Sequence, residues 1–143
     1  MIVMTKDKCF LSWKWVDEQL NEIGDRLEGV EVEFVSGIPR GGLIPAVMMS
    51  HAFGFKYISY SSAKLLPSDL RKKTLVIDDI ADTGHTLKEA SELKFITSTL
   101  AMRVGSIVTP RLYGELITDQ RWLVFPWETL DSVPIQDYLV NTK

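Results

Sequence analysis

The segment LVIDDIADTGHT, residues 75–86, constrains this chain more than any other part of the sequence. An apolar run, typical of a strand buried on both faces, ends in the carboxylates Asp78 and Asp79. A third carboxylate, Asp82, opens a Thr-Gly turn that leads into a helical pattern. A strand, a turn and a helix in this order aim backbone N–H groups at one point, where they can bind phosphate. Acidic side chains beside that point suit sugar hydroxyls and Mg²⁺, so the segment predicts a sugar phosphate site.

The composition favours one globular domain over residues 1–143. A formal net charge of −3 argues against a protein that mainly binds nucleic acid, and no apolar stretch approaches the roughly 20 residues that a membrane span needs. We therefore expect no nucleic-acid or membrane partner. The single cysteine, Cys9, is expected to be an ordinary half-buried residue. Together with the lack of a signal-peptide pattern, it indicates a cytoplasmic protein.

Alternating strand and helix patterns predict an α/β fold with a mostly parallel central sheet, helices on both faces and a small C-terminal segment. Helices are expected after Ser12, over residues 43–53 and after Thr86. Strands are expected at residues 31–36, 56–60, 74–77, 103–109 and 122–125. Residues 95–102 are compatible with either a helix end or a connection.

A second glycine-rich turn, GIPRGG at residues 37–42, also follows an expected strand and precedes an expected helix. Its glycines let backbone N–H groups approach an anion, and Arg40 adds a planar cation suited to phosphate. By itself the segment is better explained as a tight turn. Both turns, however, leave the carboxyl ends of strands, where ligands bind in such sheets. Together they would suit a ribose that carries a 5-phosphate and a 1-pyrophosphate.

Several segments resemble the type I phosphoribosyltransferases. Residues 75–86 resemble the motif that binds 5-phosphoribosyl-1-pyrophosphate (PRPP), and residues 35–42 resemble the pyrophosphate loop. RWLVFPWE at residues 121–128 is similar to the purine-contacting segment of the short microbial xanthine-guanine and hypoxanthine enzymes, and residues 103–114 to the strand and turn before it. The resemblance covers residues 8–128. It implies an enzyme that transfers 5-phosphoribosyl from PRPP to guanine, hypoxanthine or xanthine, with release of pyrophosphate.

The resemblance also implies roles for residues of both turns. Asp78 and Asp79 would hold the ribose hydroxyls, directly or through the cofactor Mg²⁺. The residues that would wrap the 5-phosphate are Asp82, Thr83, Gly84, His85 and Thr86. Asp82 would also be the general base beside the imidazole ring of the purine. The pyrophosphate would be bound by Pro39, Arg40, Gly41 and Gly42, and the Pro39–Arg40 peptide bond is expected to be cis.

On the base side, the resemblance implies that Trp122 stacks on the purine and that the backbone carbonyl of Leu123 accepts from its edge. Related enzymes carry a lysine, three residues before a glycine, that donates to the 6-oxo group. Counting back from Gly114 places Arg111 there, and an arginine differs from lysine in reach and geometry. The preferred base is therefore open. Glu128 would contact metal or water, with a surface role as the alternative.

The chain departs from these enzymes before the PRPP motif, where residues 61–73 replace a longer mobile loop that closes over the reaction. Tyr60, Ser61 and Lys64 would serve any remaining lid. A short lid implies slow turnover, leakage to hydrolysis, or cover from a neighbouring subunit. It also favours a second hypothesis, a PRPP- or nucleotide-binding regulatory module with little turnover. A third is an enzyme for adenine or a pyrimidine. Homodimers or homotetramers are usual in the family.

Overall fold

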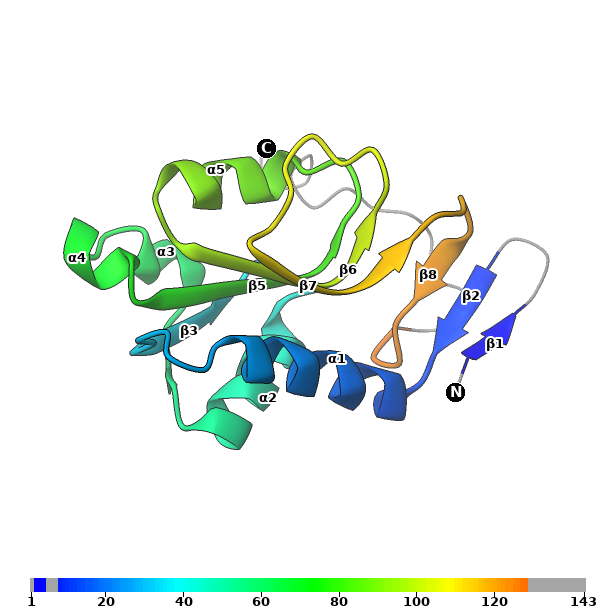
Figure 1. Cartoon of the computed structure of the whole chain (residues 1–143), viewed down its shortest axis with the longest axis horizontal. Helices are drawn as coiled ribbons and strands as arrows, with labels where there is room; N and C mark the ends of the chain where they lie inside the picture. Colours follow the sequence, from blue (N-terminus) through cyan, green and yellow to red (C-terminus); the bar gives the residue numbers. More distant parts are fainter. Residues whose placement is uncertain (1, 5–7, 129–143) are drawn as a thin grey trace.

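The structure, a computed structural model, describes residues 2–4 and 8–128. Its centre is a five-stranded sheet in the order β4-β3-β5-β6-β7 (Figure 1). The strands are β3 (Phe34–Gly37), β4 (Lys56–Tyr57), β5 (Thr74–Ala81), β6 (Ile96–Arg103) and β7 (Leu112–Ile117). Neighbouring strands pair in parallel throughout this sheet. The predicted fold class is therefore confirmed.

Helices cover both faces of this sheet (Figure 1). The helices are α1 (Trp13–Arg26), α2 (Leu43–Phe53), α3 (Tyr60–Ala63), α4 (Ser68–Arg71) and α5 (His85–Glu92). Leu75 and Ile77 of β5 belong to the apolar cluster that α1 and α2 form with the sheet, whereas Val76 belongs to the cluster with α3 and α5. Because β5 is buried on both faces, its sequence is apolar without alternation. None of the described helices combines the length and apolar character needed to cross a membrane.

The predicted start of α1 and the predicted bounds of α2 are confirmed. The Ser12 side chain accepts a hydrogen bond from the Trp15 backbone N–H at 3.1 Å, which caps α1. Helix α2 has the predicted bounds and ends at Gly54, whose φ of 76° is in the left-handed region that glycine adopts easily.

A second, smaller sheet joins the two ends of the described chain (Figure 1). It contains β1 (Ile2–Met4), β2 (Lys8–Leu11) and β8 (Trp122–Val124), with β1 antiparallel and β8 parallel to β2. Only β8 was predicted. Cys9 lies opposite Leu123 and is 5% exposed, so it is fully buried rather than half-buried, and burial raises the pKa of its thiol.

The structure corrects three predicted strands. The strand predicted at residues 103–109 is wrong, because β6 ends at Arg103 and residues 104–111 form the connection to β7. The strand predicted to reach residue 60 ends at Tyr57, since Ser59 caps α3 instead. Strand β5 continues to Ala81, so the two carboxylates that were expected beyond this strand lie within it.

Candidate functional site

The two glycine-containing turns lie side by side at the carboxyl edge of the central sheet. Gly37 at the end of β3 lies opposite Ile77 of β5, and the Ile38 N–H donates to the Ile77 carbonyl at 3.0 Å. A Cβ atom on Gly41 would lie 2.1 Å from Oδ2 of Asp79. The glycine thus allows the backbone of the first turn to rest against a carboxylate near the end of β5.

The first turn, residues 37–42, is called the GIPRGG turn from here on. Its Pro39–Arg40 peptide bond is cis, as predicted. The Arg40 side chain is exposed, and the Arg40 carbonyl accepts from the Leu43 N–H at 3.1 Å as α2 begins. Gly42 is the N-cap of α2 and makes no side-chain capping hydrogen bond. The turn therefore presents an exposed cation directly before the N-terminus of a helix, a position where the helix dipole also favours anions.

The acidic pair is oriented by backbone hydrogen bonds at the end of β5. Asp78 is 8% exposed and its Oδ1 accepts from the Asp79 N–H at 2.8 Å. Asp79 is half-buried and its Oδ1 accepts from the Ile80 N–H at 2.7 Å. Charge-assisted bonds of this kind hold both side chains as acceptors at the sheet edge.

Residues 82–86, the DTGHT turn, are braced by the connection that follows β6. The Ile107 N–H donates to the Thr83 carbonyl at 3.0 Å. Gly84 has a φ of 90°, and a Cβ there would lie 2.8 Å from Oγ of Ser106. The side chains of Thr83 and His85 are exposed at this turn. Gly84 has no side chain to cap α5, and the His85 N–H donates to Oγ1 of Thr83 at 3.5 Å. A helix N-terminus at the end of a tight turn is a place where anions bind.

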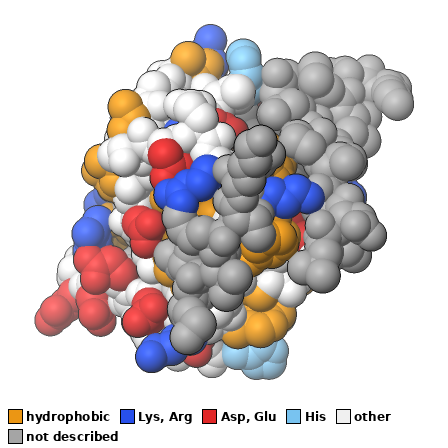
Figure 2. All heavy atoms as spheres, turned by 90° about the vertical axis from the view of Figure 1, so that its right-hand side faces the viewer, with side chains coloured by type: hydrophobic (Ala, Val, Ile, Leu, Met, Phe, Trp, Pro, Cys, Tyr) orange, Lys and Arg blue, Asp and Glu red, His pale blue; other side chains and the backbone are white. Residues whose placement is uncertain are grey.

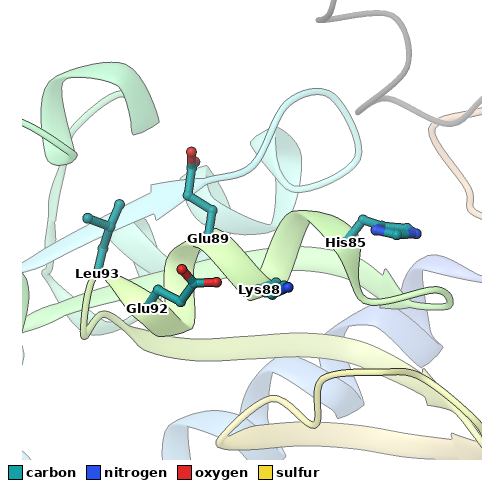
Figure 3. A pocket seen from close by; sticks show the side chains of 5 residues that line it. All are labelled: His85, Lys88, Glu89, Glu92 and Leu93. Carbon is teal, nitrogen blue, oxygen red and sulfur yellow. The ribbon is translucent and has the colours of Figure 1, made fainter.

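The outer side of α5 carries a shallow depression (Figure 3). It is lined by His85, Lys88, Glu89, Glu92 and Leu93. These residues recur at helical spacing, so the depression follows one exposed side of the helix. Its mixed charges do not favour an anion.

The predicted purine-contacting residues lie on and beside β8. Trp122 is half-buried, and its indole N–H finds no hydrogen-bond partner among the described residues. Leu123 is 5% exposed. Glu128 closes its own turn, since its Oε1 accepts from the Phe125 N–H at 2.8 Å. Figure 2 views this end of the molecule and shows small groups of acidic, basic and hydrophobic side chains around the described surface.

Arg111 is not brought to the site. Its backbone N–H donates to Oγ1 of Thr97 at 2.9 Å, and the next residue, Leu112, lies opposite Ser98. Because β6 and β7 run parallel, Arg111 lies at the amino edge of the sheet, across from the two turns. The prediction of a base contact there fails because the strand before it was placed too late in the sequence.

Arg103, which the sequence pattern did not single out, lies at the carboxyl edge instead. It is the last residue of β6 and is 6% exposed. Its Nε donates to Oδ1 of Asp82 at 3.0 Å, and its Nη2 donates to the carbonyl of Arg121, also at 3.0 Å. One signal for Arg103 was present in the sequence: it is the single charged residue at the end of an otherwise uncharged run, residues 95–103. A charged residue in such a run is expected to be buried only where partners meet its charge.

Two of the residues expected to serve a lid, Tyr60 and Lys64, bind the Glu89 side chain of α5. Tyr60 is 9% exposed, and its hydroxyl donates to Oε1 of Glu89 at 2.9 Å. Burial, and then this hydrogen bond, raise the pKa of Tyr60. Lys64 pairs with the same carboxylate at 3.4 Å, whereas Ser61 is exposed. The segment is thus a packed part of the fold, and Tyr60 is a core residue.

No protein-family model matches the chain. It is 26% identical over 140 residues to the xanthine-guanine phosphoribosyltransferase of Idiomarina loihiensis, a match that covers 83% of this chain and 86% of that protein. The crystal structure of a purine phosphoribosyltransferase from Pyrococcus horikoshii is 28% identical with a TM-score of 0.72, covering 92% of this chain and 100% of that one.

The xanthine-guanine-hypoxanthine phosphoribosyltransferase of Helicobacter pylori is 14% identical, with a TM-score of 0.70 over 86% of this chain and 93% of that one, which shows a shared fold alone. Sequence and fold together therefore show the resemblance to type I phosphoribosyltransferases that residues 75–86 predicted, and these relatives are enzymes of the pentosyltransferase class.

Proposed function

We propose that this protein transfers the 5-phosphoribosyl group of PRPP to a 6-oxopurine and releases pyrophosphate. The observation that carries the proposal is the contact of Gly41 with Asp79, which joins the GIPRGG turn to the acidic end of β5. A pentose with a phosphate at one end and a pyrophosphate at the other needs such neighbouring anion-binding turns with acceptors between them. The xanthine-guanine and purine phosphoribosyltransferases among the relatives support a purine, and in particular xanthine or guanine, as the acceptor.

In this proposal the GIPRGG turn binds the leaving pyrophosphate. Pro39 and Gly42 shape the turn, while Arg40 and the N–H of Gly41 contact the anion. Asp78 and Asp79 accept from the ribose hydroxyls. As the bond from the anomeric carbon to pyrophosphate breaks, positive charge develops on the ribose ring, and fixed carboxylates nearby stabilise it.

The DTGHT turn binds the 5-phosphate through the N–H groups of Gly84 and His85 and the hydroxyls of Thr83 and Thr86. Asp82, whose side chain is 32% exposed, is the general base that takes a proton from the imidazole ring of the purine as the ring bonds to the anomeric carbon.

On the base side of the same proposal, Trp122 stacks on the purine, and the carbonyl of Leu123 accepts from its edge. In the same proposal, Glu128 contacts the metal ion or a water molecule at the margin of the site. Arg111 has no part in the proposal, because of its place at the opposite edge of the sheet.

The acidic pair fits a magnesium ion that arrives with the substrate. Within residues 2–4 and 8–128, no group of three or more His, Cys, Asp or Glu side chains is placed to hold a metal alone. Mg²⁺, however, is commonly bound by one or two carboxylates together with substrate oxygens and water. Asp78 and Asp79 would supply those carboxylates, and the ion would neutralise charge on the pyrophosphate.

The test is pyrophosphate release with PRPP, Mg²⁺ and each of guanine, hypoxanthine and xanthine. Asp82→Asn should lower kcat roughly 100-fold or more, because it removes the general base, while PRPP binding measured by calorimetry persists. Asparagine keeps an oxygen for Arg103, so the fold is retained. Asp25→Asn, on an exposed part of α1, is the matched control. No release by the wild-type protein with any of these bases would refute the proposed function.

A second candidate is a regulatory module that binds PRPP or a nucleotide with little turnover. The observation that favours it is the attachment of Tyr60 and Lys64 to Glu89, because a fastened segment cannot close over a reaction. PRPP binding without pyrophosphate release would support this candidate over the enzyme.

The resemblance further supports a homodimer or homotetramer acting in the cytoplasm, with PRPP and a purine base as substrates and with no nucleic-acid or membrane partner. Sedimentation equilibrium would test the assembly: a monomer across the micromolar range would contradict it.

A further inference from the structure

Arg103 is a buried cation at the point where three segments of the chain meet. We propose that it is a positioning residue, which holds Asp82 and the chain just before Trp122 in one fixed arrangement. This inference rests on the proposed function, because it assigns Arg103 a part in presenting the general base to the purine.

The guanidinium of Arg103 bonds in three directions. Nε donates to the carboxylate of Asp82 at 3.0 Å, in the DTGHT turn. Nη1 donates to the carbonyl of Asp119, and Nη2 to the carbonyl of Arg121 at 3.0 Å. The acceptors therefore come from the turn after β5 and from the connection between β7 and β8.

The burial of Arg103 shows that these bonds are needed. Its side chain is only 7% exposed, whereas that of Asp82 is 32% exposed. A charged group taken out of water is costly unless it is paired and hydrogen-bonded. Because the planar fork of arginine meets one carboxylate and two carbonyls, its orientation is fixed. Arg103 thus acts through Asp82, which stays open to a ligand on its exposed side.

A local bond supports the segment before Trp122 on the far side of the guanidinium. The backbone N–H of Arg121 donates to Oδ1 of Asp119 at 3.0 Å, and the two side chains form an ion pair. The hydrogen bond from Arg121 lowers the pKa of the Asp119 carboxyl. The loop is thus a preformed turn that offers the carbonyls of Asp119 and Arg121 to Arg103, and Trp122 follows it directly.

Losing Arg103 should affect the base more than PRPP. The DTGHT turn keeps its other support, the bond from the Ile107 N–H to the Thr83 carbonyl and the close fit of Gly84. Phosphate binding by this turn should therefore persist. What is lost is the fixed distance between Asp82, which takes the proton, and Trp122, which stacks on the ring. Small errors in such geometry lower rates strongly.

The experiment compares Arg103→Met and Arg103→Lys with the wild-type enzyme in steady-state pyrophosphate release. Arg103→Met should lower kcat/KM for the base roughly 100-fold, while KM for PRPP changes less than about threefold. Arg103→Lys keeps the charge but cannot reach three acceptors in one plane, so it should recover only part of the loss. Equal losses toward both substrates, or full recovery by lysine, would overturn the proposal.

Arg26→Met is the matched control. Like Arg103, Arg26 donates to a backbone carbonyl, here that of Tyr113 in β7, and pairs with a carboxylate, here that of Glu22. It lies on α1, however, and 46% of its side chain is exposed. Its loss should leave the kinetics with both substrates unchanged.

Hydrogen exchange separates this inference from the proposed function. Without any substrate, Arg103→Met should speed exchange at residues 82–86 and 119–123 together, and leave β3 and α2 protected. If the wild-type protein releases no pyrophosphate, the proposed function fails, and this measurement still tests the link. Unchanged exchange in both segments, or a uniform increase throughout the chain, would refute the link made by Arg103. If Arg103→Met does not fold, the same measurement is made on Arg103→Lys.

Discussion

The two turns at the sheet edge and the segment between β4 and β5 are neighbours that are held in place by different means. The turns are fixed by backbone fit: a methyl group on Gly41 would lie 2.1 Å from Oδ2 of Asp79, and one on Gly84 would lie 2.8 Å from Oγ of Ser106. Residues 58–73 are instead fixed by side chains, chiefly Tyr60 on Glu89 and Arg71 on the carbonyls of Leu66 and Leu93.

This difference shows where the molecule tolerates change. A site built on close backbone contact has no spare volume, so the smallest added group displaces it. A segment held by a few polar side chains can be released one bond at a time. We therefore expect substitutions in the turns to remove activity, and substitutions in the segment to alter stability by small amounts.

The largest effect is expected from Gly41→Ala. The new methyl group must push the short Asp79 side chain away from the GIPRGG turn, which would separate the proposed ribose site from the proposed pyrophosphate site. We expect kcat/KM for PRPP to fall roughly 100-fold or more, with the circular dichroism spectrum unchanged. Pyrophosphate release under limiting PRPP is the measurement.

Gly29→Ala is the control for Gly41→Ala. Nothing lies within 4 Å of a Cβ at Gly29, but its φ is 79°. Alanine there should cost about 1 kcal/mol of stability and leave kcat/KM unchanged. Near-wild-type activity in Gly41→Ala would show that the backbone contact does not shape the site.

Local patterns were sufficient to predict most of the fold that positions the site. The capping Ser12, the helix over residues 43–53 and the apolar run into Asp78 each depend on neighbours in sequence, and each was found. The convergence of the turns followed from the parallel strands alone. The cis Pro39–Arg40 bond followed from the resemblance rather than from any pattern.

The parts that were missed depend on contacts between distant residues. Strand β6 carries Thr97, Ser98 and Thr99, all buried, so no apolar run marked it, and the strand was placed over residues 103–109 instead. That shift moved the expected base contact to Arg111 and hid Arg103. The β2–β8 pairing joins short segments from the two ends of the described chain, which no local periodicity reveals.

A smaller effect is expected from Tyr60→Phe, and it depends on pH. Because burial raises the pKa of Tyr60, the folded protein keeps a proton that the unfolded chain loses near pH 10. The contribution of this proton is therefore fully present below about pH 10 and is lost as the pH rises above it. Tyr60→Phe should lower the free energy of unfolding by about 1 kcal/mol at pH 7. It should also reduce the fall in this free energy above pH 10.

Urea unfolding of both proteins at pH 8, 10 and 11 measures this difference. If the free energies of unfolding of the two proteins differ by the same amount at all three pH values, Tyr60 does not titrate differently in the folded and unfolded states. Turnover at pH 7 should change less than about threefold, because the segment is a fixed part of the fold; a strong rise in kcat would show that its attachment restrains a closure.

The smallest effect is expected from Lys64→Met, which removes the cation that lies 3.4 Å from Oε1 of Glu89 and 5.0 Å from the centre of the Tyr60 ring. Both partners of the ion pair are well exposed, at 37% and 54% of their side chains, so solvent screens it. We expect a loss of about 0.5 kcal/mol or less, seen as a small drop in Tm that disappears in high salt. Lys88→Met, on the exposed side of α5, is the control. If Lys64→Met instead lowers the free energy of unfolding as much as Tyr60→Phe does, then charge rather than burial holds residues 58–73 against α5. In that case the segment would differ from the close-fitting turns in being held by electrostatic interactions, which high salt weakens.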